Sequence, residues 1–183
     1  MTARRRSIGA ATDTKHVLVR ADRNDTVHLH LRFGTMADGS PRLEPVHAEP
    51  LGGPRFRLVN SPGWTYGVAA GDEVERTDEH GGFRVVRRGG NVSVRLFSTE
   101  ALRRDRIEAL EIEVRERLGG RVDGGLDDRA RVFTIPATIG FGRIEALFDP
   151  FVRDPSIAIG AVEWEYGNVH DETGAPLGGS NAP

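Results

Sequence analysis

The chain has 183 residues, of which 38% are hydrophobic and 28% are charged, a balance typical of a soluble globular protein with one domain or two small ones. It contains no cysteine, which excludes disulfides, thiolate catalysis and cysteine-ligated metals. Its net charge of −2 argues against a globally basic nucleic-acid binder. No apolar run approaches the ~18 residues that a membrane helix needs, and no signal-peptide pattern follows the N-terminal arginines. We therefore expect a cytoplasmic protein without membrane partners.

The sequence divides into four segments of different character. Residues 1–15 are polar and lack periodicity, which predicts a flexible arm. Residues 16–88 predict a small β-domain, and residues 89–168 a mixed α+β domain, with no long linker between them. Residues 169–183 are rich in glycine, proline, serine and asparagine, which predicts a disordered tail.

Short strands separated by glycines fill the first block. After a brief apolar run at His16–Arg20, the segment Thr26–Phe33 alternates strictly between apolar and polar residues, the pattern of a half-buried strand. Further strands are expected at Leu43–Leu51, Arg55–Asn60, Glu73–Arg76 and Phe83–Arg87. These strands predict a small antiparallel sheet curled into a partial barrel.

The second block alternates strands with helices. A strand at Asn91–Phe97 precedes a helix over Ala101–Leu118, for which Ser98 or Thr99 is the expected N-cap and the glycines at 119 and 120 the expected end. Apolar residues recur along this helix at spacings of three and four, which predicts one buried stripe made of Ile107, Leu110, Val114 and Leu118. Then follow strands at 121–125 and 130–135, an irregular or broken helix at 139–152 and a strand at 156–166. This order is that of a ferredoxin-like α/β sandwich, with two helices on one face of four antiparallel strands. The predicted fold class is therefore α+β.

Two histidines are the best candidates for metal ligands. His28 and His30 lie on the same face of one predicted strand, and a third ligand would have to come from His16 or His47. Histidines on a polar strand face are more often simply solvated, and no HExxH-type motif is present. We therefore predict neither a metal site nor a cofactor.

Catalytic motifs are missing from the sequence: it has no GxSxG, SxxK or GxxxxGK[ST] pattern. The glycine-rich stretch Arg87–Asn91 suits either an anion-binding nest flanked by guanidinium groups or a tight turn between strands, and we favour the turn. Glu163 and Glu165 flank Trp164, so alternation places both carboxylates on a solvated face and the indole in the core. We predict no catalytic residue.

Residues 60–68 place Trp64 and Tyr66 on a loop rich in glycine. These rings either plug one end of the β-domain or act as anchors for recognition, because aromatic side chains offer large contact area at low entropic cost. RNA recognition on such a sheet needs exposed aromatics on a basic strand, which the strands at 91–97 and 130–135 lack. We therefore expect no nucleic-acid partner.

Three motifs in register suggest a family. They are Ala48-Glu49-Pro50-Leu51-Gly52, Phe56-Arg57-Leu58-Val59-Asn60-Ser61-Pro62, and Gly67-Val68-Ala69-Ala70-Gly71-Asp72-Glu73-Val74. With the arginine–glycine turn at Arg87–Arg95, they resemble a bacterial, often actinobacterial, family known only as a domain of unknown function. The sequence departs at Asn91-Val92-Ser93, where members often carry a hydroxyl-rich stretch. The resemblance implies a bacterial cytosolic protein with a β-domain joined to an α+β domain, and no catalytic residue.

These features predict a non-enzymatic binding protein that engages a protein partner, of regulatory or immunity type, through Trp64 and Tyr66. The alternative is a small-molecule sensor or an enzyme with a site between the two blocks. Its polar groups would be Glu49, Arg88 and Asn91, with Trp64 as an apolar wall. An unpaired edge strand also permits a homodimer.

Overall fold

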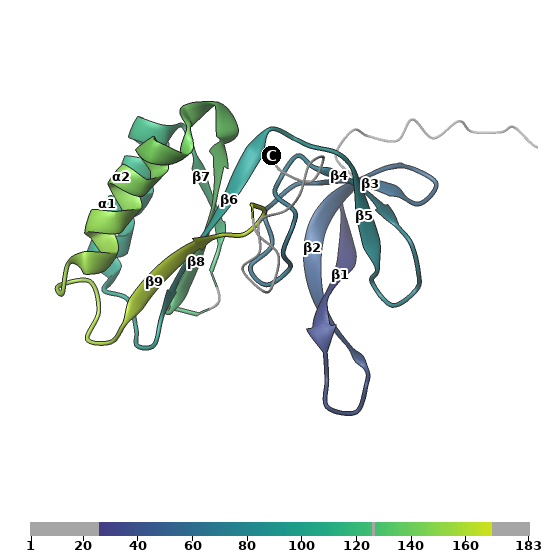
Figure 1. The fold of residues 1–183 in the computed structure, drawn as a ribbon, viewed down its shortest axis with the longest axis horizontal. Helices are drawn as coiled ribbons and strands as arrows, with labels where there is room; N and C mark the ends of the chain where they lie inside the picture. Colours follow the sequence, from purple (N-terminus) through teal and green to yellow (C-terminus); the bar gives the residue numbers. More distant parts are fainter. Residues whose placement is uncertain (1–25, 126, 170–183) are drawn as a thin grey trace, which may run out of the picture.

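The computed structural model describes residues 26–125 and 127–169, which form two antiparallel sheets placed side by side (Figure 1). The first sheet follows chain order: β1 (Val27–Thr35), β2 (Pro41–Gly52), β3 (Arg55–Leu58), β4 (Glu73–Arg76) and β5 (Phe83–Arg87). The second has the order β7-β8-β6-β9, from β6 (Asn91–Ser98), β7 (Arg121–Gly124), β8 (Ala130–Pro136) and β9 (Val162–Tyr166). The predicted α+β class is confirmed. The arm at 1–15, the run His16–Arg20 and the tail from residue 170 lie outside the described residues.

The first sheet forms because its strands alternate in polarity. In β1, Leu29 and Leu31 are buried while His28 and His30 face outward, and Val46 of β2 joins the same core. Within the described residues β1 and β5 are not paired with each other, so the sheet is not a closed barrel. A hydrogen bond from the backbone N–H of Arg32 to the carbonyl of Gly81 (2.9 Å) ties β1 to the β4–β5 turn.

Two helices, α1 (Arg104–Leu118) and α2 (Phe141–Arg153), cover one face of the second sheet, and a short 3₁₀ turn (Ala137–Ile139) precedes α2 (Figure 1). The stripe predicted for α1 is buried against this sheet and comprises Ile107, Leu110, Val114 and Leu118. Gly119 ends the helix in the left-handed conformation (φ 61°). Trp164 of β9 packs against the same core, as expected.

Three local expectations were wrong. Helix α1 starts at Arg104 and is not capped by Ser98 or Thr99, because Ser98 ends β6 and the Thr99 hydroxyl accepts a hydrogen bond from the N–H of Ala161 (3.1 Å). Helix α2 is continuous to Arg153 and contains Pro150 near its end. The last strand begins only at Val162, since turns occupy the residues after α2.

The two sheets are joined both by the chain and by one long loop. Only three residues separate β5 from β6, so no long linker exists, as predicted. The loop between β3 and β4, residues 59–72, reaches from the first sheet to the second, where the N–H of Gly67 donates to the carbonyl of Gly167 (2.8 Å). This loop carries Trp64 and Tyr66 and is called the junction loop below.

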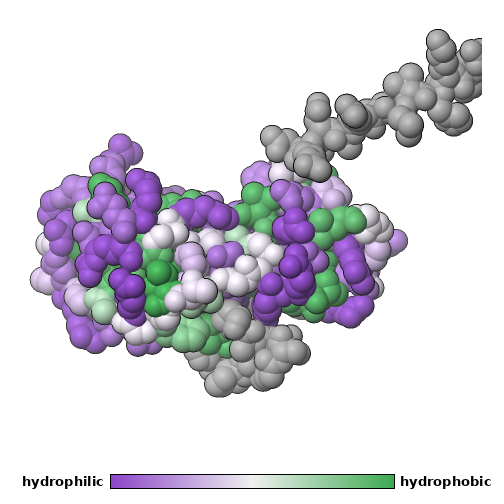
Figure 2. Space-filling view, turned by 90° about the horizontal axis from the view of Figure 1, so that it is seen from above, coloured by the Kyte–Doolittle hydropathy of each residue, from purple (hydrophilic) through white to green (hydrophobic). Residues whose placement is uncertain are grey.

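The surface is largely polar on the side shown in Figure 2. Hydrophilic side chains cover much of both halves of the molecule there, and hydrophobic ones gather in small separate areas. Among the described residues, no helix combines the length and apolar character that crossing a membrane would require.

Candidate functional site

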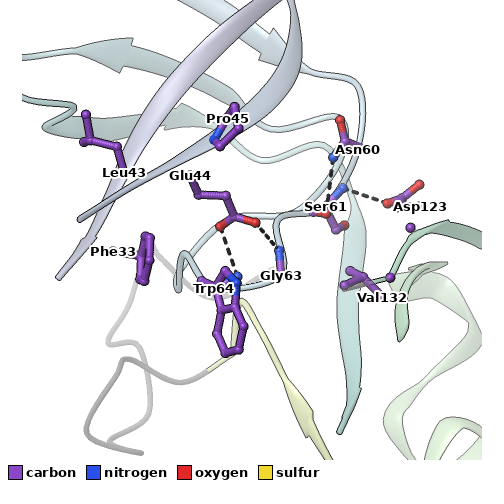
Figure 3. A pocket seen from close by; sticks show the side chains of 12 residues that line it. Phe33, Leu43, Glu44, Pro45, Asn60, Ser61, Gly63, Trp64, Asp123 and Val132 are labelled. Atoms are coloured by element: carbon purple, nitrogen blue, oxygen red, sulfur yellow. Dashed lines mark hydrogen bonds between the residues drawn. The ribbon is translucent and has the colours of Figure 1, made fainter. Parts of the chain in front are cut away.

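A carboxylate from β2 holds the tip of the junction loop (Figure 3). Glu44 accepts hydrogen bonds from the backbone N–H groups of Gly63 (2.6 Å), Trp64 (3.0 Å) and Thr65 (2.8 Å), and from the Thr65 hydroxyl (2.9 Å). Successive N–H groups that converge on one anion form a nest, and bonds to an ionised acceptor are stronger than neutral ones. The loop tip is therefore fixed to the first sheet.

The Trp64 ring is stacked between the two sheets. Its centroid lies 6.3 Å from that of Phe33 on β1 and 5.7 Å from that of Phe97 on β6, at interplanar angles of 23° in both cases. Even so, 42% of Trp64 is exposed. The ring thus contacts both halves of the molecule, as a plug would, while the residue remains partly exposed, as a recognition anchor must.

A pocket of about 350 Å³ lies beside this ring (Figure 3). Both sheets contribute to it. Its apolar walls are Phe33, Leu43, Pro45, Trp64 and Val132, and its polar side chains are Glu44, Asn60, Ser61 and Asp123. Among the described residues, the lining has two carboxylates and no basic side chain. A pocket thus lies between the two blocks, where the alternative prediction placed a site, but its polar side chains are not the ones expected.

The second carboxylate of the pocket anchors the other side of the loop. Asp123 accepts hydrogen bonds from the N–H of Ser61 (2.7 Å), from Nε of Arg121 (2.8 Å) and from the Thr134 hydroxyl. Because Thr134 gives its single proton to Asp123, the Ser61 hydroxyl 2.6 Å away must donate to Thr134. Ser61 also accepts from the N–H of Ala70 (3.0 Å). Its hydroxyl proton is committed to this chain, which argues for a structural role and against a nucleophile.

The glycine-rich turn after β5 does hold an anion, but that anion belongs to the protein. Asp72 is completely buried and accepts hydrogen bonds from the N–H of Gly89 (2.7 Å), from Nη1 of Arg88 (2.7 Å) and from the N–H of Ala69 (3.0 Å). Asn91 donates to the carbonyl of Ala70 (2.8 Å). Arg88 and Asn91 therefore support the base of the junction loop and do not line the pocket.

Tyr66 contacts the second sheet through a buried arginine. Its hydroxyl donates to Glu165 (2.8 Å), and the guanidinium of Arg95 lies 4.4 Å from its ring centroid. Arg95 also donates to the carbonyl of Thr65 and lies 3.5 Å from Glu165. Burial, then the Glu165 hydrogen bond, raises the pKa of Tyr66, while burial lowers the pKa of Arg95. On the face of β9 that was expected to be solvated, Glu163 is exposed, whereas Glu165 is half-buried and is bonded to Tyr66.

Of the predicted site residues, the structure places Trp64 alone in the pocket. Glu49 lies on the outer face of β2, where it pairs with Arg57 (3.4 Å). Sequence reasoning missed Glu44 and Asp123. Their sequence signal is absent because each binds a loop segment at least 19 positions away in the chain.

The histidine candidates separate into a pair and a single residue. His28 faces His47 across the β1–β2 ladder, with 3.2 Å between their Nε2 atoms, whereas His30 is opposite Pro45. Within residues 26–125 and 127–169, no three histidine, cysteine, aspartate or glutamate side chains gather as a metal site. His16 lies outside this range.

A family model described as a domain of unknown function (DUF4265) matches residues 44–157, well over half of the sequence. The chain belongs to this family. The family suggested by the three motifs is thereby confirmed as one of unknown function. The DUF4265 segment begins at Glu44 within β2 and contains the whole junction loop and Asp123, whereas β1 and β9 lie outside it.

One solved structure shares the fold of this DUF4265 protein. It is described as a novel crystal structure of a hypothetical protein from Neisseria gonorrhoeae, and it superposes with a TM-score of 0.56. The match covers 87% of this chain and 100% of that one at 14% sequence identity, so it carries the fold alone. No curated protein matches the sequence.

Proposed function

We propose that this DUF4265 protein is a non-enzymatic binding protein that engages a protein partner, in a regulatory or immunity-type role, through the pocket beside Trp64. The observation that carries the proposal is a partly exposed indole held in place from both sheets at the rim of a pocket. Tryptophan is enriched among residues that dominate binding energy, above all where it is ordered before binding.

The pocket favours an apolar group of the partner. Its two carboxylates already accept hydrogen bonds from the chain, Glu44 from the loop tip and Asp123 from Ser61, Arg121 and Thr134. What remains for a partner is mainly the surface of Phe33, Leu43 and Trp64. We therefore expect the partner to insert an aromatic or branched aliphatic side chain against the indole.

We further propose that the second sheet and its helices form a ferredoxin-like sandwich. The order β7-β8-β6-β9 supports this, as do the helices that follow β6 and β8 on one face of the sheet. We also propose a bacterial cytoplasmic setting, which the resemblance of the three motifs supports. On this view the sandwich serves as a rigid support against which the junction loop and Trp64 are held.

The test is site-specific photocrosslinking in bacterial cells. A benzophenone amino acid replaces Leu43 at the pocket rim or, as a control, Ile112, which is exposed on α1. We expect one protein to be crosslinked from position 43 and not from position 112. The crosslink should be lost in Trp64→Ala, whose expected loss of about 2 kcal/mol weakens a complex roughly 30-fold. Crosslinks that are equal from both positions would refute the proposal.

Two controls separate binding from folding. Ile112→Ala removes a comparably exposed apolar side chain away from the pocket and should retain the partner. If Trp64→Ala lowers the melting temperature strongly, the variant Leu43→Asp tests the same pocket, because it places a charge on its apolar wall. A folded Leu43→Asp variant that keeps the partner would also refute the proposal.

The second candidate is a small-molecule sensor or an enzyme that uses the same pocket. A volume of about 350 Å³ favours it, because ligand pockets typically measure ~300–1,000 Å³. The chain has two tryptophans, so Trp164→Phe leaves Trp64 as the only indole fluorophore. Saturable quenching of this fluorescence by small aromatic fragments, abolished by Leu43→Asp, would favour the small-molecule alternative over a protein partner.

A further inference from the structure

The outer face of the first sheet carries two imidazoles that point at each other. His28 on β1 and His47 on β2 are direct partners in the strand register. Their Nε2 atoms lie 3.2 Å apart, and their ring centroids lie 4.7 Å apart at an interplanar angle of 56°. Both side chains are exposed. We propose that His28 and His47 form a bidentate site for a divalent transition-metal cation, with Zn²⁺ as the test ion.

The separation of the two nitrogens suits one shared metal ion. Zinc–imidazole bonds measure ~2.0–2.1 Å, and a tetrahedral angle between two such bonds places the nitrogens about 3.3–3.4 Å apart. The distance of 3.2 Å between the Nε2 atoms of His28 and His47 is close to this value. Small rotations of the two rings are therefore enough to direct both lone pairs at the same ion. Imidazole nitrogen is also a ligand that zinc, copper and nickel accept readily.

The backbone beneath the imidazoles is fixed in advance. The neighbouring register pair Leu29–Val46 is buried on the opposite face of the sheet, so a slip of one residue would expose the core. The backbone N–H of His47 donates to the side-chain oxygen of Asn60 (3.0 Å), which holds β2 from its other side. A cation therefore orders only the two side chains, and the ordering cost of binding stays small.

A hydrogen bond between the rings is the competing arrangement. At 3.2 Å one neutral imidazole donates its Nε2 proton to the Nε2 lone pair of the other. Metal and proton compete for the same two atoms, so binding of the cation releases that hydrogen bond. Within the described residues no third histidine, cysteine or carboxylate completes a metal cluster. Water, or a group from another molecule, would take the remaining coordination positions.

Isothermal titration of the full chain with Zn²⁺ at pH 7.5, where imidazole is mostly neutral, tests the site. We expect His28→Gln and His47→Gln each to weaken zinc binding at least tenfold. The matched control is His80→Gln, since His80 is an exposed histidine on the β4–β5 turn. This variant should bind within about twofold of the wild type. Nitrogen NMR should show both Nε2 resonances shifting together as zinc is added.

Three results would overturn the proposal. The first is a wild-type affinity no greater than that of the double variant His28→Gln/His47→Gln. The second is an equal loss in His80→Gln, which would indicate nonspecific binding to surface histidines. The third is a tenfold loss in His30→Gln, which would assign the metal to another histidine set than the cross-strand pair. Melting temperatures of the variants confirm folding, and none of these results depends on the pocket beside Trp64.

Discussion

Replacement of Asp72 by asparagine tests whether one buried carboxylate holds the base of the junction loop. Asp72 is fully buried, and its two oxygens accept hydrogen bonds from Gly89, Arg88 and Ala69. Asparagine keeps the shape of the side chain but substitutes an NH₂ group for one oxygen. Whichever way the amide is turned, that group faces at least one donor and cannot accept its proton.

The expected cost follows from these contacts. A hydrogen bond to a charged group contributes ~1.5–3 kcal/mol, and the removal of one partner from a buried ion pair costs ~3–5 kcal/mol. Arg88 retains 14% side-chain exposure, so water offsets only a small part of this loss. We expect Asp72→Asn to lower the free energy of unfolding by about 3–4 kcal/mol, which lowers the melting temperature by roughly 6–16 °C in a chain of this size.

Urea unfolding followed by circular dichroism measures this loss. Asp105→Asn is the matched control, because it makes the same chemical change in an ion pair with Arg103 whose carboxylate side chain is 62% exposed. Exposed pairs contribute little, so this variant should lose far less stability than Asp72→Asn. If Asp72→Asn is no less stable than Asp105→Asn, the carboxylate does not hold the loop and the reasoning fails.

Two further predictions concern stability. A hydrogen bond from Arg87 is the main cause that lowers the pKa of Glu73 from 4.5 to about 2, so its stabilisation is present above pH 4.5 and is lost as the pH falls toward 2. Urea titrations should therefore show a steeper loss of stability over this range in the wild type than in Glu73→Gln, and equal slopes would contradict the assignment. A Cβ at position 89 would collide with the backbone of Gly71, so Gly89→Ala should cost about 1–3 kcal/mol. Gly142→Ala on the open surface of α2 should show no loss by the same measurement.

Much of the fold could be predicted from local patterns. The alternation at 26–33 identified β1, and the spacing of Ile107, Leu110 and Val114 identified the buried face of α1. Both patterns work because burial of one face repeats along a strand or helix with a fixed period. The start of α1 was predicted wrongly, because a capping residue in the sequence does not show which contacts it makes in the fold. Residues suited to capping are present at 98 and 99, but Ser98 is the last residue of β6 and the Thr99 hydroxyl accepts a hydrogen bond from the N–H of Ala161.

The candidate site depended on contacts that no local pattern describes. The sequence identified Trp64 as unusual but left open whether it was buried, and the ring is stacked between the two sheets while 42% of the residue stays exposed. The sequence did not predict the contacts of Glu44 or of Glu165, because each of these carboxylates acquires partners from the junction loop. At the glycine-rich turn, where the sequence favoured a tight turn over an anion-binding nest, the group that accepts the Gly89 N–H is the side chain of Asp72.

The sequence alone therefore determined the α+β class, the order of strands and helices, and the family, since these depend on periodicity and on short motifs. Only the tertiary structure decided that residues 59–72 lie between the sheets, which side chains line the pocket, and that His28 faces His47 and not His30. The physical reason is distance along the chain. Polarity patterns specify which face of an element is buried, whereas pairing between distant elements is specified by how those faces pack together.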